Sequence, residues 1–231
     1  MTLKQQITKI TALLIMAISF NIGFAADDWA RFSRFETKND SLKAIEGWQP
    51  KAVFMGNSIT EGWINNHPEF FSKNNFVGRG ISGQTSYQML LRFRDDVINL
   101  HPEIAVINAG TNDVAENNHV YNEDRTLGNI ISMAELANAN GIKVVLTSVL
   151  PAEKFGWRKE IEGANAKIKS LNNRIKQYAE TNNYPYVDYY SLMNIDDKAL
   201  NPAYSNDGVH PTSSGYDVME SLILPVIQNI R

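Results

Sequence analysis

The chain has 231 residues, of which 43% are hydrophobic and 20% charged, and its formal net charge is -3. This length and composition are typical of one globular domain with a buried core. The charge leaves no basic surplus, so nucleic acid is not an expected partner. Because the chain contains no cysteine, disulfides, thiolate metal sites, a cysteine nucleophile and a lipidated cysteine are excluded.

Residues 1–25 have the pattern of a secretory signal peptide. Two lysines give a basic start, residues 10–20 are almost wholly apolar, and Gly-Phe-Ala at 23–25 places small residues where signal peptidase reads them. The apolar run of about a dozen residues is short against the ~20 that a spanning helix needs, so cleavage is favoured over a membrane anchor. We expect an exported protein, periplasmic or secreted, with one mature domain at 26–231 and no stable membrane insertion after cleavage.

Strands and helices are predicted to alternate along the mature chain. An amphipathic pattern at 28–47 indicates one or two short helices. Apolar and β-branched runs predict five strands, and longer segments with helical periodicity predict four helices. The strands are expected at 51–55, 76–77, 104–109, 144–149 and 186–189, and the helices at 84–100, 122–140, 158–181 and 213–230. This order implies right-handed β-α-β units, and hence a three-layer α/β/α domain with a doubly wound, five-stranded parallel sheet.

A candidate nucleophile follows the first predicted strand, where Gly-Asn-Ser-Ile-Thr occupies 56–60. Gly56 removes side-chain bulk before the turn, and the polar residues after Ser58 are typical of an opening helix. Ser58 would then lie near a helix N-terminus, whose free N–H groups favour developing negative charge. From this segment alone, Ser58 could equally serve only as a helix N-cap.

Three further polar segments follow predicted strands. Gly-Arg-Gly-Ile-Ser-Gly occupies 78–83, Gly-Thr-Asn-Asp occupies 110–113, and Asp-Gly-Val-His-Pro occupies 207–211 after a long loop. In a doubly wound sheet, ligands bind outside the carboxyl ends of the strands. We therefore expect these segments to converge on the candidate nucleophile. Together they offer a nucleophile, two kinds of oxyanion donor, and an acid with a histidine, which is a hydrolytic set.

These four segments occur in the order and at the loop positions of the SGNH, or GDSL-type, esterase and lipase family, which the mature chain resembles over nearly its whole length. The form Gly-Asn-Ser-Ile-Thr-Glu-Gly-Trp at 56–63, together with 110–113, is most similar to one branch of that family. That branch includes platelet-activating-factor acetylhydrolase-like enzymes and bacterial carbohydrate acetylesterases. The resemblance implies a flavodoxin-like SGNH hydrolase fold and a serine esterase that needs no metal or cofactor.

The resemblance also implies a role for each matched residue. Ser58 would attack an ester carbonyl after His210 takes its proton, and Asp207 would orient the imidazole and stabilise its protonated form. The backbone N–H groups of Ser58 and Gly80 and the side-chain amide of Asn112 would hold the tetrahedral oxyanion.

Other readings of these residues exist. Asp207 and His210 could be metal ligands, although two residues in one loop make a poor site. Asn112 could merely cap the segment that follows it.

Two positions differ from the family pattern. Asn57 stands where the GDSL form has Asp, and Gly78 stands where many members have Asn. Neither departure removes a reacting group.

Three aromatic residues are candidates for substrate binding: Trp63, Phe155 and Trp157. They could stack on a sugar ring or an acyl chain, or they could be packing residues. No long apolar lid segment is evident, which favours a small acyl group on a soluble or polymer-bound alcohol. The sequence thus predicts an exported esterase that removes acetyl groups from carbohydrate, as a small molecule or a polysaccharide.

Alternatives to this function remain at the level of the sequence. A lysophospholipase or a short-chain acyl thioesterase could use the same site. A carbohydrate-binding module with a dead hydrolase site belongs to another class, and its signature would be the loss of Ser58, Asn112 or His210, all of which are present. The sequence indicates no oligomeric state.

Overall fold

The computed structural model describes residues 28–230. The predicted signal peptide at 1–25 lies outside these residues. Within 28–230, no helix combines the length and the apolar character that crossing a bilayer requires.

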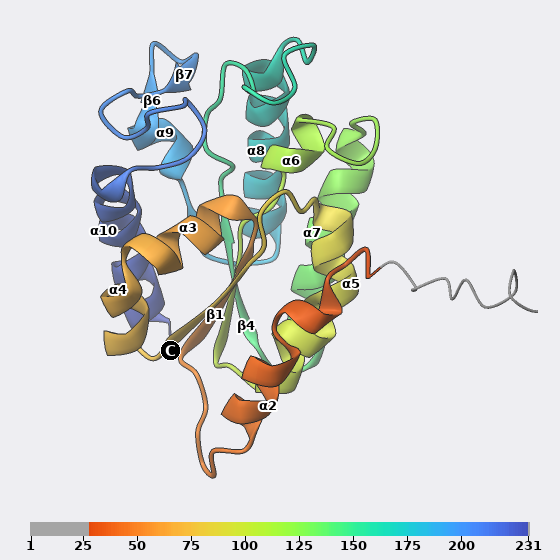
Figure 1. Ribbon diagram of the computed structural model, residues 1–231, viewed down its shortest axis with the longest axis vertical. Coiled ribbons are helices and arrows are strands. Elements are labelled where there is room, and N and C mark those ends of the chain that lie inside the picture. Colours follow the sequence, from red (N-terminus) through yellow and green to blue (C-terminus); the bar gives the residue numbers. More distant parts are fainter. Residues whose placement is uncertain (1–27, 231) are drawn as a thin grey trace, which may run out of the picture.

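The centre of the domain is a parallel sheet of five strands (Figure 1). The strands are β1 (Ala52–Gly56), β2 (Phe76–Gly80), β3 (Ile104–Ile107), β4 (Lys143–Thr147) and β5 (Tyr186–Val187). Their order is β2-β1-β3-β4-β5 and every pairing is parallel. The chain leaves β1 for one neighbour and later returns to its other side, which makes the carboxyl end of β1 the switch point where doubly wound sheets bind ligands.

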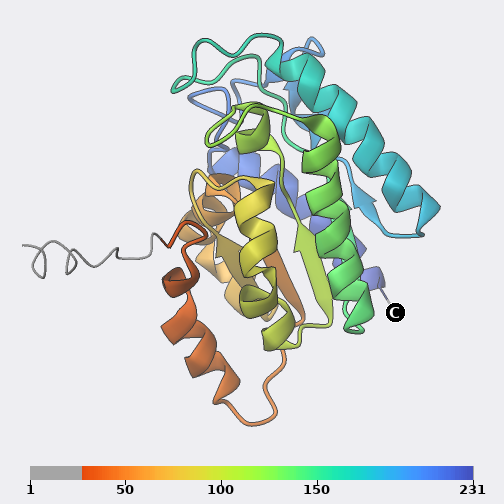
Figure 2. The ribbon, with the colours of Figure 1, turned by 90° about the vertical axis from the view of Figure 1, so that its right-hand side faces the viewer.

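Helices cover both faces of the sheet, as predicted (Figures 1 and 2). On one face lie α5 (Ser86–Asp96), α7 (Glu123–Ala139) and α8 (Ala164–Thr181), and on the other lie α3 (Ser58–Asn66), α4 (Pro68–Lys73), α9 (Tyr189–Met193) and α10 (Ser213–Asn229). Successive side chains of a strand point to opposite faces. Val53 and Met55 of β1 accordingly join the core under α5, and Phe54 joins the core under α3. The predicted three-layer α/β/α class is therefore confirmed.

Several short elements complete the domain. They are η1 (Phe32–Arg34), α2 (Glu36–Lys43), η2 (Ile98–Leu100), α6 (Thr111–Val114), and a small antiparallel hairpin of β6 (Asn194–Ile195) and β7 (Ala199–Leu200). The two helical segments before β1 agree with the prediction for 28–47.

Several predicted elements have different limits in the structure, and the fifth strand and the helix predicted at 158–181 are two of them. The fifth strand ends at Val187 because the Asp188 side chain caps α9, accepting the Ser191 N–H at 3.0 Å. The helix predicted from residue 158 begins at Ala164 instead. The segment before it forms an isolated antiparallel bridge between Phe155 and Arg158.

The carboxyl ends of β1 and β2 are tied together by the fully buried Arg92 of α5. Its Nη2 donates to the carbonyl oxygen of Gly56 at 3.1 Å and to that of Arg79 at 2.9 Å. Its charge is compensated by Asp96, at 2.8 Å. A buried cation needs such a partner, and here the pair also fixes the two strand ends from which the next loops start.

Candidate active site

Ser58 is the first residue of α3, directly beyond the carboxyl end of β1. The N-cap is Asn57, not Ser58: the Asn57 side chain accepts the Ile59 N–H at 2.9 Å. Asn57 thus satisfies a free donor of the helix end and leaves the Ser58 hydroxyl for another partner. In the described part of the chain, the Ser58 N–H makes no hydrogen bond.

The partner of Ser58 is His210, 152 positions later. Ser58 Oγ lies 2.9 Å from His210 Nε2, and His210 Nδ1 lies 2.7 Å from Asp207 Oδ2. A proton on Nδ1 is held by the carboxylate, which leaves Nε2 free to accept the Ser58 proton. Both ring nitrogens of His210 therefore have partners within the chain. The three predicted catalytic residues are brought together in the geometry of a nucleophile, a base and an orienting acid.

Asp207 is held as an anion by its own loop. Its Oδ1 accepts the backbone N–H of Val209 at 2.9 Å and that of His210 at 2.8 Å. Partial burial disfavours ionisation, but the hydrogen bonds from the His210 N–H and ring and from the Val209 N–H outweigh it and lower the pKa of Asp207 to about 2. The carboxylate is therefore charged at any pH where His210 can act as a base.

The loop that carries His210 is held by an internal hydrogen bond and by the helix that follows it. Ser205 Oγ donates to the His210 carbonyl oxygen at 2.8 Å. In α10, which starts just after the loop, Tyr216 OH donates to the Ile59 carbonyl oxygen in α3 at 2.9 Å. The helix that follows His210 and the helix that begins at Ser58 are thus joined directly.

A pocket of about 370 Å³ opens at these residues. Its lining residues come from the five connections that follow the strands of the sheet and are Ser58, Ser82, Gly83, Asn112, Asn117, Trp157 and His210. Asn112, the second residue of α6, is buried and donates one Nδ2 proton to the Gln84 carbonyl oxygen at 2.9 Å. A side-chain amide has a second proton, which is available to a ligand in this pocket.

The glycine in the pocket is Gly83, and the prediction of Gly80 is wrong. Gly80 ends β2, where a Cβ atom would lie 2.2 Å from the Glu61 backbone nitrogen, so its role is close packing against α3. Gly83 occupies the third position of the turn closed by the Gln84 N–H and the Ile81 carbonyl oxygen. Its φ of 79° suits glycine. Within residues 28–230 the Gly83 N–H donates no hydrogen bond.

Of the three aromatic candidates, only Trp157 lines the pocket. The residue is 44% exposed, and its ring centroid lies 6.0 Å from that of His210. Phe155 is wrong as a substrate contact: it is fully buried and packs behind Trp157 at a centroid distance of 5.3 Å. Phe155 is too deeply buried to contact a substrate, but it supports the ring of Trp157, which is exposed.

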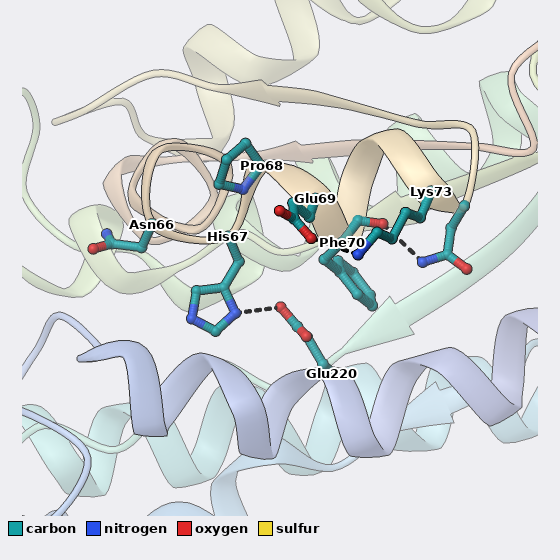
Figure 3. A pocket seen from close by; sticks show the side chains of 8 residues that line it. Asn66, His67, Pro68, Glu69, Phe70, Lys73 and Glu220 are labelled. Carbon is teal, nitrogen blue, oxygen red and sulfur yellow. Dashed lines mark hydrogen bonds and ion pairs between the residues drawn. The ribbon is translucent and has the colours of Figure 1, made fainter.

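Trp63 is also wrong as a rim residue, because it is 2% exposed and stacks between Phe70 and Tyr216. Its indole N–H donates to Glu220 Oε1 at 2.9 Å, an oxygen that also lies 2.7 Å from His67 Nδ1. Figure 3 shows His67 and Glu220 facing each other in a second pocket, which shares no lining residue with the pocket at Ser58.

His67, Glu220 and Asp217 are close enough to one another to ligate a metal ion. However, Glu220 already accepts the buried indole N–H of Trp63, and Asp217 is 71% exposed. The group therefore has a complete structural explanation as the link between α10 and the junction of α3 and α4.

Two pocket-supporting residues were not predicted. The Glu61 carboxylate accepts both the backbone N–H and the hydroxyl of Ser82, and the Asn117 side chain donates to the Gly83 carbonyl oxygen at 3.1 Å. Glu61 follows Ser58 by three residues, so one helical turn places it beside the nucleophile. That spacing is the signal that could have identified it, whereas nothing local to Asn117 indicates its partners.

Asp113, next to Asn112, holds its loop through buried hydrogen bonds. It is fully buried and accepts hydrogen bonds from the backbone N–H of Ser86 at 2.9 Å and from the Thr126 hydroxyl at 3.3 Å. Burial raises the pKa of this carboxyl group against the effect of those bonds. Asp113 thereby joins α6 to the starts of α5 and α7.

The chain was compared with known proteins. It is 60% identical to a GDSL-like lipase of Bacteroides thetaiotaomicron, with a TM-score of 0.83 over 86% of this chain and 98% of that one. An acetylxylan esterase of Geobacillus stearothermophilus shares the fold, with 22% identity and a TM-score of 0.62 over 77% of this chain and 94% of that one.

A multidomain esterase of Ruminococcus flavefaciens is 28% identical over 82% of this chain, which spans 24% of that protein's length. The model of the GDSL-like lipase/acylhydrolase family matches residues 54–218, a range that contains Ser58, Gly83, Asn112, Asp207 and His210. The chain therefore belongs to the GDSL-like lipase/acylhydrolase family.

Proposed function

We propose that the protein is an exported serine esterase that hydrolyses acetyl esters of carbohydrates through an acyl-enzyme. The observation that carries the chemistry is the hydrogen-bonded series of Ser58, His210 and Asp207, with distances of 2.9 and 2.7 Å. The name of the multidomain esterase, a relative at 28% identity, supports the same class of reaction.

In the first half-reaction, His210 Nε2 takes the proton of Ser58 as Oγ bonds to the carbonyl carbon of the ester. The carbonyl oxygen becomes an anion, held by the backbone N–H groups of Ser58 and Gly83 and by Asn112 Nδ2. Each such donor contributes about 10² to 10³ in rate. The intermediate collapses, His210 protonates the departing alcohol oxygen, and the acyl group remains on Ser58.

In the second half-reaction, a water molecule replaces the alcohol. His210 takes a proton from the water as its oxygen bonds to the acyl carbon, and the same donors hold the second oxyanion. Collapse breaks the bond to Ser58 Oγ, which recovers its proton from His210, and the carboxylic acid leaves. Asp207 stays ionised throughout and stabilises each imidazolium that forms.

The preference for a short acyl group is supported by the pocket. Its volume is about 370 Å³, and among its lining residues only Trp157 offers a large apolar surface. A long acyl chain needs an extended apolar channel to leave water. One exposed indole beside polar side chains suits a sugar ring, which has both an apolar face and hydroxyl groups.

The test is hydrolysis of p-nitrophenyl esters from acetate to palmitate, and of an acetylated oligosaccharide, by the purified protein and by Ser58→Ala. A matched control is Ser41→Ala, since Ser41 lies in α2 and bonds only to the Thr37 carbonyl oxygen. We expect acetate to be preferred, Ser58→Ala to be inactive and Ser41→Ala to be unchanged. Turnover by Ser58→Ala would show that Ser58 is not the nucleophile. A preference for long-chain esters would indicate a lysophospholipase.

A further inference from the structure

Asn117 connects three residues that line the pocket. Its backbone N–H donates to the Asn112 carbonyl oxygen at 3.1 Å. Its side-chain Nδ2 donates to the Gly83 carbonyl oxygen at 3.1 Å, and its Oδ1 accepts the indole N–H of Trp157 at 2.8 Å. Both ends of one planar amide are therefore used, one for each partner.

The direction of this amide is set by its partners. The Trp157 indole nitrogen can only donate, and the Gly83 carbonyl oxygen can only accept. The Asn117 oxygen must therefore face Trp157, and its nitrogen must face Gly83. Neither aspartate nor alanine can make both contacts.

On the Gly83 side, the bond restrains the most flexible residue of the turn. A glycine at φ 79° has no side chain to limit its ψ angle. The neighbouring residues are held elsewhere, Ser82 by Glu61 and the Gln84 carbonyl oxygen by Asn112. Asn117 supplies the remaining tether and so fixes the glycine whose N–H faces the developing oxyanion in the proposed reaction.

On the Trp157 side, the bond sets the angle of an exposed ring. Phe155 supports that ring from behind, and Arg158 donates to the Glu116 carbonyl oxygen, which ties the loop of Trp157 to the loop of Asn117. Trp157 as a whole keeps 44% of its surface exposed. This open surface is available to the alcohol part of an ester whose carbonyl lies at Ser58.

We propose that Asn117 is a positioning residue that couples the oxyanion turn to the alcohol-binding surface. It orients Gly83 for the acyl group and Trp157 for the sugar, so one side chain affects both the chemical step and the choice of alcohol. This role rests on the proposed esterase function. It also predicts that changes at Asn117 and Trp157 act on alcohol binding through a shared contact.

The test compares Asn117→Ala, Trp157→Phe and the double variant on p-nitrophenyl acetate and on peracetylated xylobiose. Trp157→Phe keeps a ring but loses the N–H, so it should raise KM for the sugar ester and lower kcat for p-nitrophenyl acetate less than Asn117→Ala does. Asn117→Ala should raise the same KM and also lower kcat for both esters, each by about three- to tenfold for a lost hydrogen bond. In the double variant, the rise in KM should be no larger than in Asn117→Ala alone.

The matched control is Asn118→Ala. Asn118 belongs to the same loop and contacts Thr85 and Gln88 instead of pocket residues, so kcat and KM should not change while thermal stability falls. Independent, multiplicative effects on KM, or an unchanged kcat in Asn117→Ala, would overturn the coupling role while the esterase assignment stands. Absence of wild-type turnover with both esters would overturn the esterase function and this role together.

Discussion

The carboxylate of Glu61 accepts both the backbone N–H and the hydroxyl of Ser82, and this ties the turn of Gly83 to the helix that begins at Ser58. The other carboxylate oxygen pairs with Arg34 at 2.9 Å. Burial opposes the charge, yet the hydrogen bonds from Ser82 and Arg34 outweigh it and lower the pKa of Glu61. Two of the proposed oxyanion donors are thus fixed relative to one another by a single anion.

Replacing Glu61 with alanine should lower kcat for p-nitrophenyl acetate by about tenfold with little change in KM, because an oxyanion donor acts mainly in the transition state. Arg34→Ala is the matched control: it removes the ion pair but leaves the Ser82 contacts, so kcat should stay within about twofold, as exposed ion pairs contribute little. A larger effect of Arg34→Ala than of Glu61→Ala would contradict this role.

Asp207→Asn should lower kcat by about 10² to 10⁴, because an amide nitrogen facing His210 Nδ1 favours the wrong tautomer. Its effect on stability should depend on pH. The pKa of Asp207 is depressed to about 2 in the folded protein, so its contribution is present above the unfolded pKa of about 4 and is lost as the pH falls toward 2.

The measurement for Asp207 is chemical unfolding of the wild type and of Asp207→Asn between pH 2 and pH 7. The difference in the free energy of unfolding should be constant above about pH 5 and shrink below pH 4. A difference that grew on acidification would show that the carboxylate is not stabilised as an anion.

Gly83 and Gly80 should respond differently to alanine. At Gly83 the nearest atom to a new Cβ is Asn117 Nδ2 at 4.0 Å, so Gly83→Ala should fold, with a backbone cost of about 1 to 2 kcal/mol, and lose activity through the displaced N–H. At Gly80 the Cβ would lie 2.2 Å from backbone, so the loss should be one of stability first. Measuring both thermal unfolding and kcat for each variant separates a loss of stability from a loss of activity. Near-normal activity of Gly83→Ala would exclude Gly83 as an oxyanion donor.

Trp63→Phe should change stability and not substrate binding. The variant keeps an aromatic ring in the buried cluster but removes the donor to Glu220 Oε1, which costs about 0.5 to 1.5 kcal/mol because Glu220 is partly exposed and keeps His67 as a partner. KM for an acetylated sugar should stay at the wild-type value. A raised KM with unchanged stability would show that Trp63 contacts the substrate.

The sheet and the long helices could be predicted because their patterns are local. β1 and β3 are wholly buried apolar runs, and α7 and α8 span many turns with a clear apolar face. The short elements could not be predicted in this way. For example, α9 has only five residues and starts at the N-cap Asp188, a residue type that is equally typical of the end of a strand. Short segments take their conformation from contacts that are distant in sequence.

The proposed catalytic residues were predictable for a related reason. Ser58 and the Asp207–His210 pair lie in compact segments whose residue types carry the chemistry, whereas the choice between Gly80 and Gly83 depends on which peptide reaches the pocket. The three aromatic residues looked alike in sequence, and only burial separates Trp157 from Trp63 and Phe155. The contacts of Glu61 and Asn117 become visible only when the loops are placed side by side.

The hydroxyl of Ser58 and the imidazole of His210 are separated by 152 positions, and the helix after His210 is anchored on the helix of Ser58 through Tyr216 and Ile59. A nascent chain that has emerged as far as residue 200 thus contains all five strands of the sheet and Ser58 but not His210. Ester cleavage during refolding would consequently appear only when the last helix docks. In this fold, the onset of turnover reports when the carboxyl-terminal helix has docked on the rest of the domain.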